Sequence, residues 1–162
     1  LVRNGFFMII ILSAFITTAA VVREAVNSPP SIDLVDAFRF LAMQGQDAEV
    51  VFTHYTYGDY IPVLAKKRTF SDERSVLYDR RATIDGLELM HTYDPARIRS
   101  ILRKYGITYV IVTNDMESLL VWDLPGHGLS YTTTLPELFE EVYHTETVRI
   151  YRARIARLPL LR

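Results

Sequence analysis

The first strong pattern along the chain is an apolar run near its beginning. Gly5 to Val22, "GFFMIIILSAFITTAAVV", holds 18 residues without a charge and lies between Arg3 and Arg23. At about 1.5 Å per residue, a helix of this length spans roughly 27 Å, close to the hydrocarbon core of a bilayer. The run predicts a transmembrane helix, with its flanks in residues 1–26. A cleaved secretory signal and a buried helix of a large core are alternatives, and one arginine on each side leaves the orientation open.

The next positions predict a helix and a strand. The sequence "NSPPS", residues 27–31, is predicted to end the first helix, because a residue that precedes a proline disfavours helical backbone. Ser31 can then cap a second helix. Over residues 31–45 apolar side chains recur at helical spacing; they are Leu34, Val35, Phe38, Leu41 and Ala42. "AEVVFT", residues 48–53, is typical of a strand that is buried on both faces. Another helix is expected to begin near Pro62.

A second helix–strand pair lies in "DPARIRSILRKYGITYVIVT", residues 94–113. Asp94 is the predicted N-cap, Pro95 takes the first helical position and Gly106 ends the helix before the strand. Residues 71–93 are charged and only weakly periodic, so they predict no clear element.

The last third of the chain predicts a helix and a hairpin. Residues 114–124 favour a helix. Val142 to Thr145 and Val148 to Arg152 alternate apolar and polar residues around "TET", which predicts an antiparallel hairpin. Together the elements predict an α/β fold: a small, mostly parallel sheet flanked by helices, with a C-terminal antiparallel hairpin, preceded by one transmembrane helix. The globular domain is expected to cover residues 27–155, and residues 156–162 form a tail.

Composition narrows the classes of function. The chain has 162 residues, of which 49% are apolar, enough for one domain with a core. Lys and Arg number 18 against 19 Asp and Glu, so the net charge of −1 gives no sign of a nucleic-acid partner. The absence of cysteine excludes disulfides and thiolate zinc sites. The four histidines lack the spacing of a metal motif, and no serine nucleophile motif is present. We therefore expect no catalytic residue and no metal ligand in this chain.

The best candidate for a binding site is "THYTYGDYIPVLAKKRTF", residues 53–70. Its candidate substrate-binding residues are Tyr55, Tyr57, Gly58, Asp59 and Tyr60. Tyrosine rings stack on the apolar faces of sugars, and a carboxylate accepts hydrogen bonds from hydroxyl groups. The alternative is a strand-to-helix turn, in which Gly58 supplies backbone freedom, Asp59 lies near a helix N-terminus and the tyrosines fill the core.

Two further positions are candidates for polar contacts. The basic residues Lys66 to Arg68 either meet lipid phosphates or form a solvated face. Asn114 follows the second buried strand, at the end where open α/β sheets present groups to ligands.

Several of these segments occur in a recognisable order. The apolar helix and the proline break precede "AEVVFT" and a tyrosine-rich loop with "PVLAKKRTF", and then come "ILRKYGITYVIV" and "LFEEVYHTETVRIYRA". From about Gly5 to Arg154 this order resembles the C-terminal extracytoplasmic domain of polytopic GT-C type membrane glycosyltransferases. That group contains dolichyl-phosphate-sugar-dependent mannosyltransferases and the catalytic subunits of oligosaccharyltransferases. The sequence begins with Leu1 rather than Met, and the resemblance implies that it is a piece of a longer membrane protein.

The resemblance carries expectations about ligands and partners. It implies that the catalytic acidic residues lie in early extracytoplasmic loops outside this chain. It also implies a lipid-phosphate-linked sugar donor for the full-length protein and leaves a divalent metal open. The expected partners are the lipid bilayer, the remaining transmembrane helices of the same chain, and a glycan or peptide acceptor. The domain itself is expected on the extracytoplasmic side of the membrane.

One motif of the resembling family falls on the candidate loop. In oligosaccharyltransferases a Trp-Trp-Asp-Tyr-Gly motif follows the first strand of this domain and helps recognise the acceptor peptide. This chain has "HYTYGDY" near that place, without the tryptophans and with the order Tyr57-Gly58-Asp59-Tyr60. The resemblance therefore implies an aromatic loop that faces a sugar or a lipid-linked substrate.

The predicted function is a non-catalytic extracytoplasmic module of a membrane glycosyltransferase, which supports acceptor or lipid-linked sugar binding next to an active site outside this fragment. The alternative is a single-pass membrane-anchored binding or sensor domain unrelated to sugar transfer. The sequence upstream of Leu1 separates them, because a glycosyltransferase would carry further membrane spans there.

Overall fold

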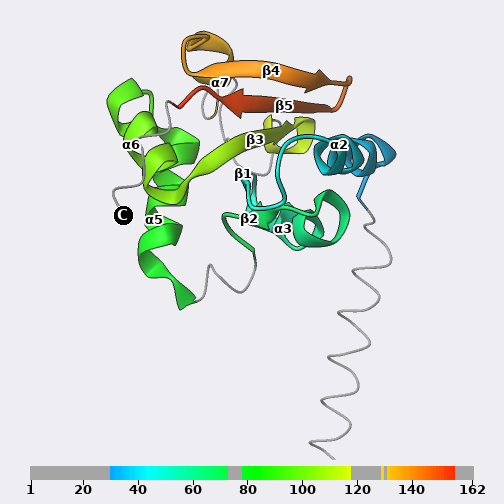
Figure 1. Cartoon of the computed structure of the whole chain (residues 1–162). Coiled ribbons are helices and arrows are strands. Elements are labelled where there is room, and N and C mark those ends of the chain that lie inside the picture. Colours follow the sequence, from blue (N-terminus) through cyan, green and yellow to red (C-terminus); the bar gives the residue numbers. More distant parts are fainter. Residues whose placement is uncertain (1–29, 73–77, 118–128, 130, 156–162) are drawn as a thin grey trace, which may run out of the picture. The chain divides into compact units, whose positions relative to one another are not determined.

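Figure 1 shows the computed structural model of the chain. The structure describes residues 30–72, 78–117, 129 and 131–155. The transmembrane helix predicted over residues 5–22 and the tail predicted over residues 156–162 lie outside the described residues. Among the residues that are described, no helix combines the length and the apolar composition needed to cross a bilayer. The described residues from Ile32 onward belong to one compact unit.

The first half of this unit contains two strands and three helical segments. These are α2 (Ile32–Met43), β1 (Val50–Phe52), α3 (Tyr55–Gly58), the π-helical turn η1 (Ile61–Ala65) and β2 (Arg68–Thr69). The buried side chains of α2 recur three and four residues apart, as its sequence predicts; they are Leu34, Ala37, Phe38 and Leu41. The predicted strand in residues 48–53 is also confirmed. Where a helix is predicted to begin near Pro62, the structure has only the five-residue π-helical turn η1.

The central part is a helix pair followed by the longest strand. α6 (Pro95–Tyr105) and β3 (Ile107–Thr113) confirm the predicted helix–strand pair. Asp94 caps α6 by accepting a hydrogen bond from the Ala96 N–H at 2.9 Å, and Gly106 ends the helix in the left-handed region with φ 64°. α5 (Arg80–His91) occupies the stretch without clear periodicity and begins at Asp79, whose carboxylate accepts from the Ala82 N–H at 3.0 Å.

The last elements are α7 (Tyr131–Thr134), β4 (Phe139–His144) and β5 (Val148–Ala153). β4 and β5 pair antiparallel, which confirms the predicted hairpin. The backbone is helical at residues 114–117, where a helix is predicted over residues 114–124; the rest of that prediction lies outside the described residues.

The sheet has five strands in the order β2-β1-β3-β5-β4. β1 pairs in parallel with β2 and with β3, whereas β5 pairs antiparallel with β3 and with β4. The sheet is therefore mixed, and the prediction of a mostly parallel sheet is wrong. The physical reason is that the hairpin pairs directly with β3, while the outer parallel strand β2 has only two residues.

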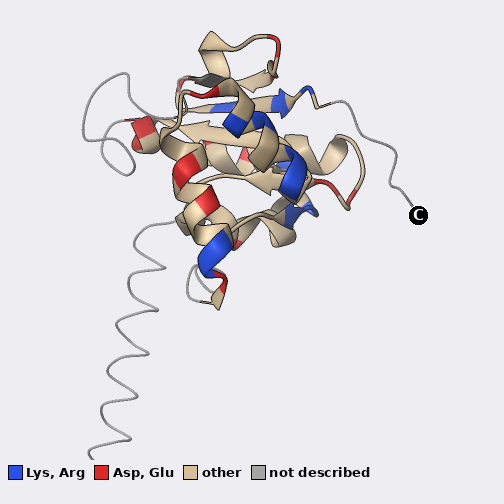
Figure 2. Cartoon of the chain, turned by 90° about the vertical axis from the view of Figure 1, so that its left-hand side faces the viewer, with Lys and Arg blue, Asp and Glu red and all other residues tan. Residues whose placement is uncertain are grey.

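Helices cover both faces of the sheet (Figures 1 and 2), as the sequence predicts. One hydrophobic cluster contains residues of α5 and α6, and the other contains residues of α2 and η1. Alternate residues of β3 belong to opposite clusters: Val110 and Val112 to the first, Tyr109 and Ile111 to the second. β3 is thus buried on both faces, and this is why its sequence is almost uninterruptedly apolar.

Candidate functional site

The parallel strands bring the candidate residues to one edge of the sheet. β1 and β3 run in the same direction, so the chain leaves both strands at the same edge, which we call the carboxyl edge. The carboxyl-edge loop, residues 53–60, follows β1 and contains α3. Within it, the hydroxyl of Tyr57 donates a hydrogen bond to Oδ2 of Asp115 at 3.1 Å. This bond joins the loop to the segment that follows β3.

Two of the five predicted site residues face solvent. Tyr55 is 42% exposed, and its ring lies against the imidazole of His54 with the centroids 4.2 Å apart. Asp59 is also exposed and precedes Tyr60, the residue at the N-terminal end of η1. A ligand at the carboxyl edge can therefore reach an aromatic face and a carboxylate.

The other three predicted residues are packed within the fold. Tyr57 is half-buried and lies against both hydrophobic clusters, and the half-buried ring of Tyr60 stacks on Phe38 with centroids 6.5 Å apart. Gly58 is buried because the backbone comes close: a Cβ there would lie 2.0 Å from the carbonyl oxygen of Ser71. Its φ is not positive, so the expectation that Gly58 supplies backbone freedom is wrong.

Burial shifts the pKa values of two polar groups in the loop. Burial lowers the pKa of His54, whose Nδ1 lies 2.6 Å from the hydroxyl of Thr56. The pKa of Tyr57 is raised, first by burial and further by the nearby Asp115 carboxylate, against an opposing effect of the Thr113 hydroxyl. At neutral pH the imidazole is therefore uncharged and the phenol remains a hydrogen-bond donor.

The sequence does not single out Asp115, although its position directly after a buried parallel strand is a usable signal. The neighbouring Asn114 is predicted as a ligand-facing group. Its side-chain amide instead donates to the carbonyl of Glu146 at 2.9 Å, and its backbone N–H donates to the carbonyl of Thr147 at 2.9 Å. Asn114 thus fastens the hairpin turn to the end of β3.

The basic cluster Lys66 to Arg68 does not form one solvated face. Lys66 and Arg68 are exposed, but the side chain of Lys67 is only 1% exposed. The Lys67 ammonium donates to the carbonyls of Gln44 at 2.6 Å and Gln46 at 3.1 Å, and it lies 3.3 Å from Oε2 of Glu49. Lys67 therefore satisfies the backbone beyond the C-terminal end of α2, where Gly45 has φ 60°.

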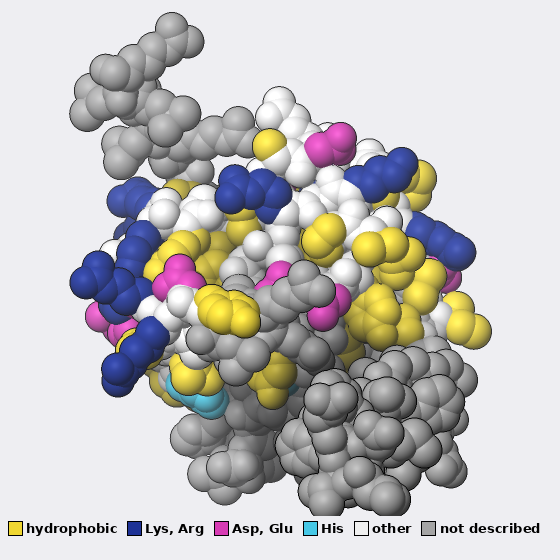
Figure 3. Space-filling view, turned by 90° about the horizontal axis from the view of Figure 1, so that it is seen from below, with side chains coloured by type: hydrophobic (Ala, Val, Ile, Leu, Met, Phe, Trp, Pro, Cys, Tyr) yellow, Lys and Arg dark blue, Asp and Glu magenta, His cyan; other side chains and the backbone are white. Residues whose placement is uncertain are grey.

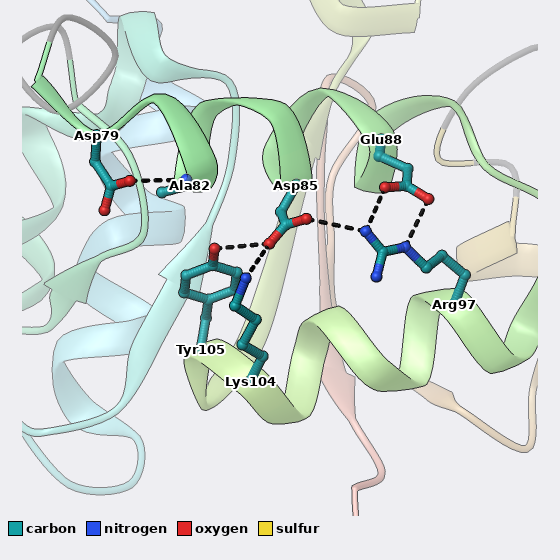
Figure 4. Close-up of polar contacts among 7 residues, drawn as sticks. All are labelled: Asp79, Ala82, Asp85, Glu88, Arg97, Lys104 and Tyr105. Atoms are coloured by element: carbon teal, nitrogen blue, oxygen red, sulfur yellow. Dashed lines mark hydrogen bonds and ion pairs between the residues drawn. The ribbon is translucent and has the colours of Figure 1, made fainter.

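A second polar cluster joins α5 to α6 (Figure 4). The buried carboxylate of Asp85 accepts hydrogen bonds from Lys104 at 2.5 Å, from Tyr105 at 2.7 Å and from Arg97 at 3.0 Å. The guanidinium of Arg97 also donates two hydrogen bonds to Glu88, both at 2.6 Å. The hydrogen bonds from Lys104 and Tyr105 lower the pKa of Asp85. Because each acceptor has its donors within the cluster, this arrangement serves to hold the helix pair together.

One face of the described surface carries side chains of mixed chemistry. Viewed from below, hydrophobic side chains lie among basic and acidic ones rather than on a face of one kind (Figure 3). Among the residues that the structure describes, no group of three or more His, Asp or Glu side chains is arranged to hold a metal ion. The carboxyl-edge loop, which presents an exposed ring and an exposed carboxylate, is the candidate site on which a function rests.

The sequence matches no protein-family model, and no curated protein matches it significantly. Solved structures do match the fold. The C-terminal globular domain of an oligosaccharyltransferase from Archaeoglobus fulgidus aligns with a TM-score of 0.61 at 13% identity, over 78% of this chain and 100% of that domain. This chain has the oligosaccharyltransferase C-terminal domain fold. A second crystal structure of such a domain from the same organism gives a TM-score of 0.52 at 13% identity, over 78% of this chain and 98% of that one.

The similarity to the oligosaccharyltransferase domain confirms, at the level of the fold, the resemblance that the order of the sequence segments indicates. The crystal structure of another Archaeoglobus fulgidus oligosaccharyltransferase aligns with a TM-score of 0.49 at 12% identity, over 56% of this chain and 14% of that one.

Proposed function

We propose that this chain is a non-catalytic, extracytoplasmic module of a membrane glycosyltransferase, and that it supports binding of the acceptor or of the lipid-linked sugar beside an active site outside the chain. The observation that carries the proposal is the fold shared with the oligosaccharyltransferase C-terminal globular domain over the whole of that domain. The sequence resemblance adds the membrane location and the sugar donor, a lipid-phosphate-linked sugar. An oligosaccharyltransferase from the same organism was solved in complex with an inhibitory peptide and a dolichol-phosphate.

The carboxyl-edge loop is the part of the module that we propose meets the ligand. Tyr55 and Asp59 offer an exposed ring and an exposed carboxylate, which suit the apolar face and the hydroxyl groups of a sugar or the side chains of a peptide. The start of α2 lies at the same edge, because the hydroxyl of Thr147 in the hairpin turn donates to Asp33 at 2.5 Å.

Transfer assays on the intact gene product test the role of the loop. Membranes that carry Tyr55→Ala or Asp59→Ala are compared with wild type for transfer of radiolabelled mannose from dolichyl-phosphate mannose, and each variant's melting temperature is measured alongside. We expect transfer to fall several-fold with little change in melting temperature, since both side chains are exposed. Tyr60→Ala is the matched control, because its ring packs on Phe38 and its loss should lower stability and activity together. Unchanged transfer in both exposed variants would contradict the proposal.

The reading frame upstream of Leu1 tests the larger claim. A membrane glycosyltransferase requires further membrane spans there and an acidic pair in an early extracytoplasmic loop. A signalling or partner domain in their place would favour the anchored sensor instead.

A further inference from the structure

Tyr57 makes a hydrogen bond through its hydroxyl to a side chain from another part of the fold. Its hydroxyl bonds to Asp115 at 3.1 Å, across 58 positions of the sequence, while its ring lies between the two hydrophobic clusters. Asp115 itself is exposed and lies directly beyond the end of β3. The bond thus connects a core-packed ring to the solvent-facing rim of the carboxyl edge.

The segment that carries Asp115 is fixed on both sides. Asn114 is bonded to the hairpin turn through its side chain and its backbone, as described above. Met116 is buried; its N–H donates to the hydroxyl of Thr113 at 3.3 Å, and its sulfur accepts from the hydroxyl of Thr53 at 3.8 Å. With both neighbours held, the backbone of Asp115 is a firm point of attachment.

The α3 turn, in contrast, is too short to be stable alone. α3 has four residues, far fewer than an isolated helix needs, and its N-cap residue His54 makes no side-chain capping bond. Tyr55 follows directly and presents its ring to solvent. The direction of that ring depends on the turn. Tyr57 attaches the turn to the segment after β3 through Asp115, and Gly58 packs against the Ser71 carbonyl.

We propose that Asp115 is a positioning residue: by accepting the hydrogen bond from Tyr57 it fixes the α3 turn, and so determines where Tyr55 meets its ligand. The inference deepens the proposed function and rests on it for the ligand, but the positioning itself is a property of the chain alone. Asp115 needs no contact with the ligand for this role.

The first experiment measures the loop directly in the 162-residue chain, in detergent micelles with ¹³Cζ-labelled tyrosine. The Tyr55 resonance, assigned with Tyr55→Phe, is followed in Asp115→Ala, Asp115→Asn and Tyr57→Phe. We expect Asp115→Ala and Tyr57→Phe to move the Tyr55 resonance, and the double variant to move it no further, because both changes remove the same bond. Asp115→Asn should restore the wild-type position, since its amide oxygen still accepts the hydrogen bond. Asp36→Ala, which removes an exposed carboxylate of α2, is the control without effect.

The second experiment repeats the series in the transfer assay with dolichyl-phosphate mannose. Loss of one such hydrogen bond should reduce transfer about three- to tenfold in Asp115→Ala and in Tyr57→Phe, with rescue by Asp115→Asn. An unmoved Tyr55 resonance in Asp115→Ala, or additive effects in the double variant, would overturn the positioning role. A moved resonance together with normal transfer in every loop variant, Tyr55→Ala included, would instead refute the proposed function and leave the positioning role supported.

Discussion

Replacing Asp85 with asparagine should strongly destabilise the domain. The change keeps the shape of the side chain, but an amide has one acceptor oxygen in place of two. If that oxygen serves Lys104 and Tyr105, the amide nitrogen faces the guanidinium of Arg97, and a donor meets a donor (Figure 4). A hydrogen bond that involves a charged group contributes about 1.5–3 kcal/mol. The side chains of Arg97 and Lys104 are partly exposed to solvent, which weakens their contribution to stability. We therefore expect Asp85→Asn to lower the free energy of unfolding by about 2 kcal/mol.

Thermal unfolding of the chain in detergent, followed by near-ultraviolet circular dichroism, measures this loss. For a domain of this size 1 kcal/mol corresponds to about 3–5 °C, so the melting temperature of Asp85→Asn should fall by about 6–10 °C at pH 7. The pKa of Asp85 is lowered in the folded state. Its stabilisation is therefore complete above the unfolded-state value of about 3.9 and is lost as the pH falls through the folded-state pKa below it. The gap between wild type and variant should close over that acidic range.

The control for this prediction is Asp36→Asn. Asp36 forms an ion pair with Arg39 at 3.0 Å, but both side chains are at least half exposed, so its loss should leave the melting temperature unchanged. The reasoning fails if Asp85→Asn melts within 1–2 °C of the control, roughly the error of such a measurement. It also fails if the gap at pH 7 persists well below the folded-state pKa, because then the charge of Asp85 does not cause it.

Three more substitutions test particular features of the backbone and core by the same melting assay. Gly58→Ala places a methyl group against the Ser71 carbonyl and should cost about 2 kcal/mol or more. A Cβ at Gly106 would meet no atom within 4 Å, so Gly106→Ala should lower stability only through the left-handed backbone, by about 1 kcal/mol. An equal loss of stability at both glycines would contradict the steric clash expected at Gly58. Lys67→Met leaves the Glu49 carboxylate and two carbonyls without their buried donor and should cost about 3 kcal/mol, and a neutral result would show that the ammonium is dispensable.

The sequence predicted the helices whose own apolar face and capping residues mark where they begin, end and pack. α2 shows one apolar face, and α6 shows in addition a capping aspartate and a terminal glycine, so each helix is readable in isolation. α5 was not predicted. Its inner face includes Asp85 and Gly86, a charged residue and a residue without a side chain. Asp85 is buried only because α6 supplies its partners, and Gly86 because Phe70 comes close, and neither contact is visible in the sequence.

The sheet and the site also depend on contacts between distant segments, which the sequence does not show. The hairpin and the strand β3 are local patterns, but the pairing of β5 with β3 is a long-range choice that the sequence left open, and the predicted parallel character of the sheet failed there. In the loop, composition identified the aromatic cluster but did not separate the exposed Tyr55 from the packed Tyr60. That separation depends on Phe38 of α2, which lies 22 positions away from Tyr60 in the sequence.

A chain of hydrogen bonds runs along the carboxyl edge and explains why the loop and the start of α2 belong together. Thr147 bonds to Asp33, Asn114 bonds to the same hairpin turn, and Asp115 bonds to Tyr57. The loop is therefore attached to the start of α2 through the end of β3 and the hairpin turn, so a substitution at Asp33 or Asn114 should disturb the loop as well as its own contact.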